Sequence, residues 1–426
     1  MELFLRIKEL ITSNKGSRFR QNFLKVAKAN VLAQAVSLIA APLLTRLYSP
    51  ADFGTVAIFT SLLSVLLAFS TLRFEWSVPN AGSRSQAAAL IVLGLSVLIF
   101  CSIIASILLW LFGSKVLFRD GFQTVEPFLF LLPVALAGSG LIQLMNAWFI
   151  READLTAVSN TKIVQSASGT GLSVIGGVAA LGPIGLIMSS IASAWLGFSF
   201  LFKHAIELRS RILKLSIKRV RVALVRFGRE STISTAVSIV NTANLAAVPL
   251  VLAQHYSTVE IGWYSIMQRL ALGPVGLLTA AMGQSFWSEA ASLVKTDRQS
   301  LRKIYLKTSK RLALAALPIS MLCFLGPFFI GPLLGRQWYS AGYILAALAP
   351  SIAAQIMVQP ITHLIVHRRQ HWKFFLDVCK LAFTLLIIIV SIKSKVDFPL
   401  LVISLSALAV VSYSILYYLN YICLSK

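Results

Sequence analysis

The most regular feature of this chain is a series of long apolar runs separated by short polar segments. Each run holds about 20 mostly apolar residues, which is the length that an α-helix needs to cross the hydrocarbon core of a bilayer. The pattern therefore predicts about twelve transmembrane helices. They cover residues 23–45, 55–78, 87–112, 122–149, 162–181, 183–203, 230–253, 261–286, 312–334, 341–366, 374–392 and 398–422.

The composition supports a membrane protein and excludes several soluble classes. Of the 426 residues, 57% are hydrophobic and 13% are charged, whereas about a quarter of the residues in a soluble domain are charged. So many apolar side chains cannot be hidden in a water-soluble core, which excludes a soluble enzyme, a disordered chain and a nucleic-acid binder of the usual kind. The four cysteines lie within apolar runs without ligand spacing, so we expect neither a disulfide framework nor a metal site.

The net charge of +24 is distributed unevenly between the two sides of the predicted membrane domain. With the N-terminus inside, twenty-six Lys and Arg residues fall in inner segments, namely 6–28, 203–229, 295–311 and 368–373. Basic residues favour the cytoplasmic side, where they face anionic lipids. Both termini are therefore predicted to be cytoplasmic. The outer segments hold six basic residues: Arg46, Lys115, Arg119, Arg336, Lys393 and Lys395.

Two segments half a chain apart share a motif. Residues 48–54 read YSPADFG and residues 256–262 read YSTVEIG. Parallel repeats are a common plan of transporters, so the sequence predicts an all-α polytopic membrane protein with two pseudo-symmetric six-helix bundles around a central cavity. Upstream of the motif, Gln34, Ser37 and Pro42 match Asn241, Asn244 and Pro249. The predicted organisation is a basic arm at 1–22, a bundle at 23–203, a basic linker at 204–229 and a bundle at 230–426.

Three charged side chains lie inside or near the ends of predicted spans. Arg73 and Glu75 are near the end of the second span, and Arg269 lies about eight residues into the eighth. A charge in the hydrocarbon is costly, so such residues usually face a cavity or a partner. Because helix positions two apart point in directions that differ by about 200°, we expect Arg73 and Glu75 not to pair. They either snorkel to the headgroups, or meet an anionic substrate and carry coupling protons.

Uncharged polar residues follow one face of the first and the seventh predicted helices. Their spacing of i, i+4 and i+7 places them on one side of a helix. Such a stripe serves either helix packing or a polar cavity, and its occurrence at repeat-related positions favours a cavity shared by both halves. The residues are Asn30, Gln34 and Ser37 in the first helix, and Ser234, Ser238 and Asn241 in the seventh.

Other polar groups have simpler interpretations. His363, His367 and His371 lack an acidic co-ligand, which favours contact with lipid phosphates over metal binding. Asp377 and Lys380 are three residues apart and are expected to neutralise each other. No Walker loop, Gly-rich strand-to-helix turn or nucleophile elbow occurs. We therefore expect no cofactor, and transport driven by an H+ or Na+ gradient, the membrane potential or the substrate gradient.

Four short stretches stand out by their order and by their places among the spans. They are residues 44–54 (LTRLYSPADFG), 72–75 (LRFE), 262–266 (GWYSI) and 335–342 (GRQWYSAG), followed by Pro350 and Pro360. With these stretches the chain resembles, over nearly its whole length, polysaccharide flippases of the O-antigen (Wzx) type in the multidrug/oligosaccharidyl-lipid/polysaccharide exporter superfamily.

The resemblance implies a transporter, not an enzyme. It would flip undecaprenyl-diphosphate-linked repeat units of O-antigen or another surface polysaccharide from the inner to the outer leaflet of the bacterial cytoplasmic membrane, by alternating access. Its expected partners are this lipid-linked oligosaccharide, anionic lipids and assembly proteins such as a polymerase and a chain-length regulator, with no nucleic acid. Glu75 is the candidate for ion coupling. The residues expected to bind the cargo, the arginines by charge-assisted hydrogen bonds, are Arg73, Arg269, Lys28, Arg46, Gln34, Asn241 and Asn244.

Three alternatives remain. A multidrug antiporter of the same superfamily would favour acidic residues for cationic drugs, and the excess of arginine inside the spans argues against it. A lipid II flippase would usually have fourteen spans. A membrane polysaccharide polymerase or ligase would need a large outer loop with catalytic charges, and no predicted outer segment is that long.

Overall fold

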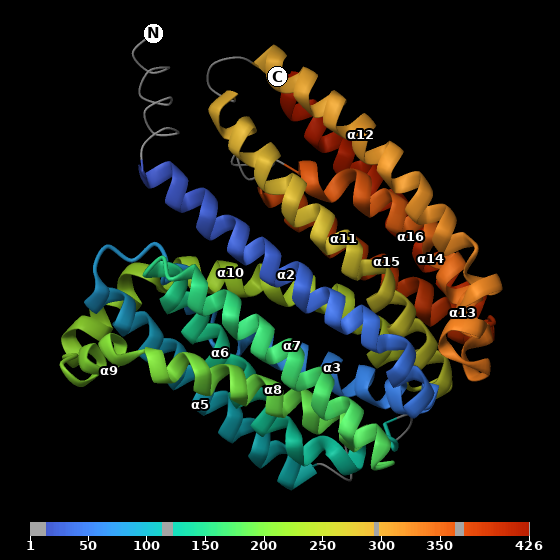
Figure 1. Cartoon of the computed structure of the whole chain (residues 1–426), viewed down its shortest axis with the longest axis horizontal. Coiled ribbons are helices and arrows are strands. Elements are labelled where there is room, and N and C mark those ends of the chain that lie inside the picture. Colours follow the sequence, from blue (N-terminus) through green and yellow to red (C-terminus); the bar gives the residue numbers. More distant parts are fainter. Residues whose placement is uncertain (1–13, 113–121, 294–297, 363–369, 426) are drawn as a thin grey trace.

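Every regular element among the described residues is a helix in the computed structural model of the chain (Figure 1). The structure describes residues 14–112, 122–293, 298–362 and 370–425. The first half contains α2 (Asn14–Leu47), α3 (Pro50–Ser70), α4 (Phe74–Ser77), α5 (Arg84–Phe112), the 3-10 helix η1 (Glu126–Leu131), α6 (Leu132–Arg151), α7 (Leu155–Val178) and α8 (Pro183–His204). After the connecting helix α9 (Ile206–Leu213), the second half contains α10 (Ile217–Leu252), α11 (Thr258–Leu293), α12 (Arg298–Phe324), α13 (Gly326–Leu334), η2 (Arg336–Trp338), α14 (Tyr339–Val358), η3 (Gln359–Ile361), α15 (Gln370–Lys393) and α16 (Phe398–Ser425).

The described helices confirm a multi-pass membrane protein. Within the described ranges, nine helical segments are long and apolar enough to cross a membrane, and the pair α12 and α13, bent by 65°, makes up to ten. Helices α7 and α11 do not meet this test, because they carry many of the polar residues that line the cavities described below. The predicted number of twelve spans therefore stays a prediction.

The two halves repeat the same packing pattern. In the first half α2 packs on α7, α7 on α8, α8 on α6, and α6 on both α5 and α3. In the second half α10 packs on α15, α15 on α16, α16 on α14, and α14 on both α12 and α11. The predicted pair of pseudo-symmetric bundles is thus confirmed, with α3, α10 and α11 forming most of the interface between them.

The repeated YS motif begins α3 and α11 with the same capping box. The Ser49 backbone N–H donates to Asp52 at 2.8 Å, and the Asp52 N–H donates to the Ser49 hydroxyl at 3.2 Å. The Ser257 N–H donates to Glu260 at 2.9 Å, and the Glu260 N–H donates to the Ser257 hydroxyl at 3.3 Å. These bonds satisfy N–H groups that the first turn of a helix leaves without partners. The acid and the serine of the motif are therefore structural.

The two motif glycines allow α3 and α11 to cross at their N-terminal ends. A Cβ atom added to Gly54 would lie 1.9 Å from the Thr258 carbonyl oxygen, and one added to Gly262 would lie 1.8 Å from the Pro50 carbonyl oxygen. Pro50 and Thr258 are the third residues of the two motifs, and the glycine of each motif contacts the third residue of the other. The crossing is therefore two-fold symmetric. Only glycine allows backbones to approach this closely.

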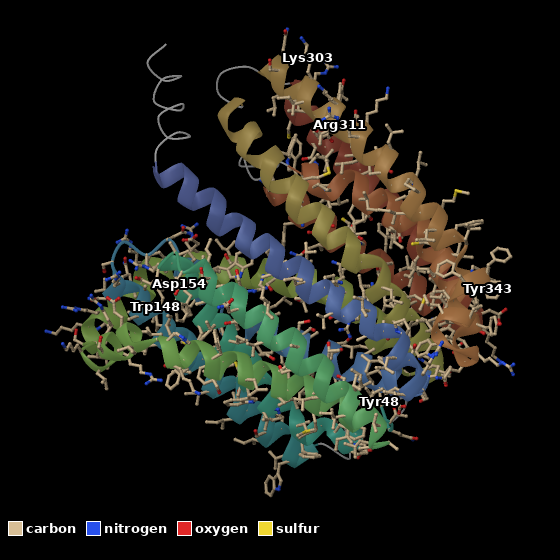
Figure 2. The ribbon with its side chains drawn as sticks, in the orientation of Figure 1. Tyr48, Trp148, Asp154, Lys303, Arg311 and Tyr343 are labelled. Carbon is tan, nitrogen blue, oxygen red and sulfur yellow. The ribbon has the colours of Figure 1, made fainter. Side chains whose placement is uncertain are left out.

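The bundles come together at this crossing and diverge at the other end. In Figure 1 the helices converge toward the lower right, near α13, and diverge toward α9 and the start of α12. Figure 2 shows Tyr48 toward the converging end, whereas Lys303 lies at the diverging end. The basic segments at α9, the start of α10 and the start of α12 therefore share the diverging end, which agrees with the predicted alternation of inner segments.

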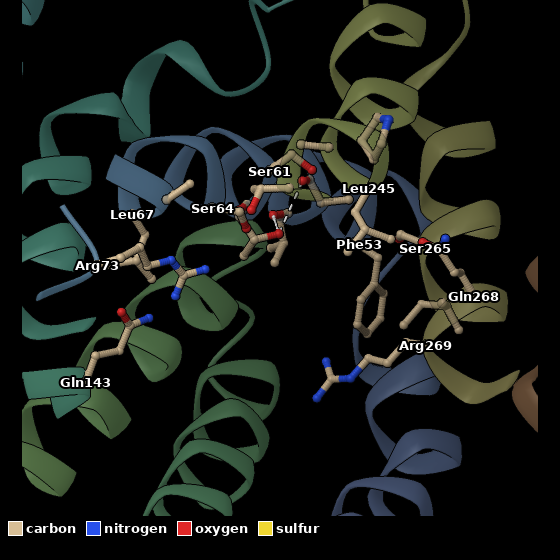
Figure 3. A pocket seen from close by; sticks show the side chains of 18 residues that line it. Phe53, Ser61, Ser64, Leu67, Arg73, Gln143, Leu245, Ser265, Gln268 and Arg269 are labelled. Atoms are coloured by element: carbon tan, nitrogen blue, oxygen red, sulfur yellow. Dashed lines mark hydrogen bonds between the residues drawn. The ribbon is translucent and has the colours of Figure 1, made fainter. Parts of the chain in front are cut away.

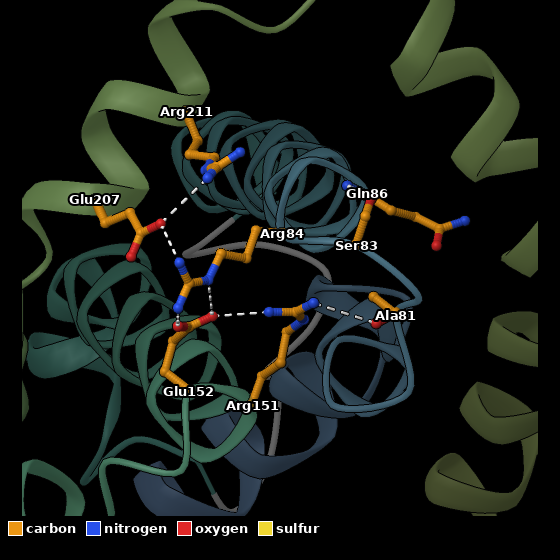
Figure 4. Close-up of polar contacts among 8 residues, drawn as sticks. All are labelled: Ala81, Ser83, Arg84, Gln86, Arg151, Glu152, Glu207 and Arg211. Atoms are coloured by element: carbon orange, nitrogen blue, oxygen red, sulfur yellow. Dashed lines mark hydrogen bonds and ion pairs between the residues drawn. The ribbon is translucent and has the colours of Figure 1, made fainter.

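An ion-pair network attaches α9 to the first bundle at the diverging end (Figure 4). Glu152 accepts from Arg84 and from Arg151, each at 2.7 Å, and Arg84 also reaches Glu207 of α9 at 2.8 Å. Helix α10 begins at Ile217, well before the predicted start at residue 230, so much of the predicted linker is helical. The helix is longer than the predicted span because a helix can continue into water, where bilayer thickness does not limit its length.

Candidate functional site

A central cavity with a volume of about 480 Å³ lies between the two bundles (Figure 3). Helix α3 forms one wall with small and hydroxyl-bearing residues, among them Thr60, Ser61 and Ser64. Helices α10 and α11 form the opposite wall, and Gln143 of α6 closes one side. The cavity therefore lies where the sequence placed it, at the interface of the repeats.

Among the described residues that line this cavity, the charged ones are Arg73 and Arg269, and none of them is acidic. Figure 3 shows their guanidinium groups pointing into the cavity from opposite walls. Arg269 makes no hydrogen bond or ion pair with the described residues, and its side chain is exposed to the hollow. Glu75, 3.3 Å from Arg73, partly neutralises that guanidinium group, but Arg269 has no carboxylate partner among the described residues, so the cavity has a net positive charge that favours an anionic occupant.

Arg73 lies in a turn, not in a helix, and this corrects the prediction that it would not pair with Glu75. Helix α3 ends at Ser70, and Leu72 and Arg73 have φ angles of 46° and 55°. The turn brings the two side chains together, so Arg73 Nη1 lies 3.3 Å from Glu75 Oε1. The helical separation of about 200° does not apply to a left-handed backbone.

The Arg73–Glu75 pair is held by neighbours from both bundles. The Thr71 hydroxyl donates to Glu75 Oε2 at 2.7 Å, and Glu75 is only 6% exposed. Arg73 Nη2 donates to the Ser238 hydroxyl of α10. Arg73 Nε has no acceptor among the described residues. The guanidinium group thus bridges the bundles, and its buried Nε–H is left without an acceptor among the described residues.

A second pocket, of about 260 Å³, lies beside Arg269 within the first bundle. It shares Phe53, Val56, Thr60, Ile266 and Arg269 with the central cavity, so the two are contiguous. Its remaining lining comes from α2, α7, α8 and Leu270 of α11, and it is rich in serine, threonine and glutamine. Arg269 is the charged residue among its described lining residues. This lining offers many neutral hydrogen-bonding groups next to a cation.

The other predicted cargo residues are dispersed. Gln34 lines the second pocket and packs against Gly273 of α11, whereas Asn244 lines a separate pocket in the second bundle, where its amide donates to the Asp377 carbonyl at 2.9 Å. Arg46, in the last turn of α2, and Asn241 are exposed and line none of the described pockets. The side chain of Lys28 lies outside the described part of the chain.

The pairing expected in the eleventh span is different in the structure. Asp377 pairs with Lys373 at 2.8 Å, one helical turn away, so it does not form the predicted ion pair with Lys380. The Lys380 ammonium lies 5.3 Å from the centre of the Tyr413 ring, in the pocket that Asn244 lines. No group of metal-ligating residues occurs among the described residues; His363 and His367 lie outside them.

Sequence reasoning missed Gln143 and Asn146 of α6, Gln268 of α11 and the hydroxyl residues of α3 and α8. A signal was present for the first two, because polar residues three apart in an apolar span share one helix face. The serines carry little signal, since serine and threonine in membrane helices often bond to their own backbone. Ser64, for example, donates to the Thr60 carbonyl at 2.6 Å.

Three of the four conspicuous stretches meet at the converging end. Trp338 is fully buried and donates to the Thr45 carbonyl at 2.9 Å, and Gln337 donates to the same oxygen at 2.8 Å. Trp263 of the third stretch donates to the Gln337 carbonyl at 3.1 Å. Burial and the nearby Asp52 raise the pKa of Tyr48, so its hydroxyl stays protonated and donates to the Ser173 carbonyl at 2.7 Å. These stretches hold the bundles together and do not line the central cavity, apart from Phe53, Ser265 and Ile266.

The family model described as "Polysaccharide biosynthesis protein" matches residues 43–342, which include these stretches and both arginines. The chain belongs to this family. No curated protein matches the sequence of this chain significantly.

Solved structures of transporters share the fold of this polysaccharide biosynthesis protein. An inward-facing multidrug resistance MATE transporter of the MOP superfamily matches with a TM-score of 0.65 and 13% identity, covering 94% of this chain and 95% of its own. The lipid II flippase MurJ in an inward closed conformation matches with a TM-score of 0.61 and 16% identity, covering 94% and 89%. A mutant of the Vibrio cholerae MATE transporter VcmN matches with a TM-score of 0.57 and 13% identity, covering 95% and 96%. The predicted fold is confirmed, and this chain shares it with these MATE and MurJ structures.

Proposed function

We propose that this chain flips undecaprenyl-diphosphate-linked oligosaccharide repeat units, of O-antigen or another surface polysaccharide, from the inner to the outer leaflet of the bacterial cytoplasmic membrane. The observation that carries the proposal is the charge of the central cavity. Among its described lining residues, the charged ones are Arg73 and Arg269. A diphosphate is the anionic group of such a cargo. Arginine binds phosphate oxygens through paired, charge-assisted hydrogen bonds.

The surroundings of the arginines suit the other parts of this cargo. Hydroxyl and amide groups in the central cavity and in the pocket beside Arg269 can exchange hydrogen bonds with sugars. The family membership agrees with a polysaccharide cargo. A multidrug antiporter for cations would place carboxylates in the cavity, and the lining described here holds none.

Alternating access follows from the arrangement of the bundles. We assign the diverging end to the cytoplasm, with both termini there, because the basic inner segments favour anionic lipids. The Gly54–Gly262 crossing and the bonds of Trp338 then close the outer side. Release of the cargo to the outer leaflet requires that these contacts separate while the inner ends approach each other.

Ion coupling and protein partners complete the proposal. Glu75 is a buried acid bound to Arg73, so its protonation by H+, or its contact with Na+, would change how strongly Arg73 holds a phosphate. A polymerase and a chain-length regulator would receive the flipped unit at the outer leaflet.

The test is transport of undecaprenyl-diphosphate-linked oligosaccharide in proteoliposomes, with Arg269→Ala compared with Lys393→Ala as control. Lys393 is an exposed cation in the last turn of α15. Loss of charge-assisted bonds worth about 1.5–3 kcal/mol should lower the affinity for the cargo about 10- to 150-fold in Arg269→Ala. The affinity of Lys393→Ala should be unchanged. Equal transport by both variants would refute the role of the central cavity.

A further inference from the structure

A third hollow, of about 410 Å³, adjoins the central cavity at the end of α3. The two share Arg73 and Gln143, so they are contiguous. The rest of the lining comes from the α4 region and from α6: Glu75, Trp76, Pro79, Asn146, Ala147 and Ile150. We call this third hollow the mouth pocket. Its lining combines an aromatic ring, two amides, a carboxylate and a guanidinium group.

Trp76 presents an uncovered indole ring to the mouth pocket. It is 63% exposed, although Phe74, Glu75 and Ser77 on either side of it are buried. The Arg73 guanidinium carbon lies 5.1 Å from the centre of the ring, and this cation–π contact helps to fix its orientation. A large aromatic ring that stays exposed inside a polar hollow offers a flat surface to a ligand.

Gln143 and Asn146 line the mouth pocket, and their amide oxygens have no hydrogen-bond donor among the described residues. They are three residues apart on α6 and therefore lie on one helix face. Gln143 Oε1 and Asn146 Oδ1 are both inaccessible to solvent and without a donor among the described residues. A buried acceptor without a partner is unfavourable. Rotation of either amide toward a bound molecule with hydroxyl or amide donors would relieve it.

We propose that the mouth pocket binds a pyranose ring of the lipid-linked cargo, and this inference rests on the proposed function. The C–H face of a pyranose is apolar and packs on an indole ring, while its hydroxyls donate to amide and carboxylate oxygens. The first sugar of such a lipid is bonded directly to the diphosphate. Arg73 lies between the mouth pocket and the central cavity, so a diphosphate there leaves the adjacent sugar next to Trp76.

An anchoring role in the headgroup region would explain the exposed indole alone. It would not explain why two amides that line the same hollow have buried oxygens without a donor among the described residues. A sugar accounts for both observations, because one molecule supplies the apolar face and the donors. The carboxylate of Glu75, paired with Arg73 at 3.3 Å, adds an acceptor of the kind that sugar hydroxyls prefer.

The experiment measures equilibrium binding of two lipids to the full-length protein in detergent. One lipid is undecaprenyl diphosphate without sugar, and the other is the undecaprenyl-diphosphate-linked oligosaccharide extracted from the cells that make this protein. The variants are Trp76→Ala and Asn146→Ala, with Trp110→Ala as control, since Trp110 of α5 is 84% exposed and lines none of the described pockets. Arg269→Ala serves as the variant that should weaken both lipids.

We expect the wild type to bind the sugar-bearing lipid about tenfold more tightly than the bare lipid. Trp76→Ala and Asn146→Ala should remove this difference without changing the affinity for the bare lipid, whereas Trp110→Ala should keep it. Equal binding of the two lipids by the wild type, or a difference that survives in Trp76→Ala, would overturn the sugar site and leave the proposed function standing. If neither lipid binds the wild type, the proposed function fails and the sugar site with it.

Discussion

The crossing of α3 and α11 gives the sharpest test of how the outer side closes. The substitution Gly262→Ala adds a methyl group 1.8 Å from the Pro50 carbonyl oxygen, whereas ordinary contact begins at 3.4 Å. The two backbones must therefore separate by about 1.6 Å. Neither backbone can move aside alone, because each belongs to the first turns of a packed helix. The variant should weaken the closed arrangement specifically.

The size of the effect follows from the cost of overpacking. Adding a methyl group to a well-packed contact costs about 1–3 kcal/mol. If this cost falls on the closed state alone, the population with an open outer side rises about 5- to 150-fold. Gly276→Ala is the matched control in the same helix, because a Cβ atom there meets nothing within 4 Å.

Cysteine labelling from the outer side measures this population. Thr60 lines both the central cavity and the pocket beside Arg269. We would introduce Thr60→Cys in a chain whose four native cysteines are replaced, and react it with a membrane-impermeant maleimide. Gly262→Ala should raise the labelling rate from the outer side by about tenfold, while Gly276→Ala should leave it unchanged. Equal rates in all three proteins would refute the closure by the glycine crossing.

Three further predictions concern contacts outside the central cavity. Trp338→Phe removes the hydrogen bond to the Thr45 carbonyl and should destabilise the protein by about 1 kcal/mol. Its melting temperature should be lower than that of the control Trp110→Phe, and equal melting temperatures would contradict this prediction. Glu152→Gln should lower the melting temperature at low salt, because Glu152 pairs with both Arg84 and Arg151, and the difference should shrink at high salt; a salt-independent effect would exclude an electrostatic origin. Glu75→Gln should make transport in proteoliposomes insensitive to an imposed pH or sodium gradient, whereas continued acceleration by either gradient would assign coupling to another group.

Several features of this chain could be predicted from its local sequence. The apolar runs predicted a multi-pass helical protein, because hydrocarbon requires every backbone group to bond within its own helix. The repeated YS motif predicted two related bundles, because the same local capping box begins the same helix in each. Arg269 was predicted to face a cavity, because a guanidinium group deep in an apolar span is stable only there.

The pairing of charged groups could not be predicted in this way. Leu72 and Arg73 have left-handed backbones, so the helical geometry assumed for Arg73 and Glu75 did not apply. Asp377 pairs with Lys373, whereas the ammonium group of Lys380 lies over the Tyr413 ring of the neighbouring helix, although both lysines are within reach of Asp377 on a helix. Side-chain choices of this kind depend on neighbouring helices.

By itself, then, the sequence determined the membrane class, the helical runs, the internal repeat and the two arginines, because these depend on solvent and on neighbours within a few residues. The tertiary structure alone decided which surfaces meet. It brought Gly54 against Thr258 and Gly262 against Pro50, placed Trp338 on the Thr45 carbonyl, and gathered Trp76, Gln143 and Asn146 around one hollow. Such contacts join residues far apart in the chain, and only the packing of helices across two bundles can bring them together.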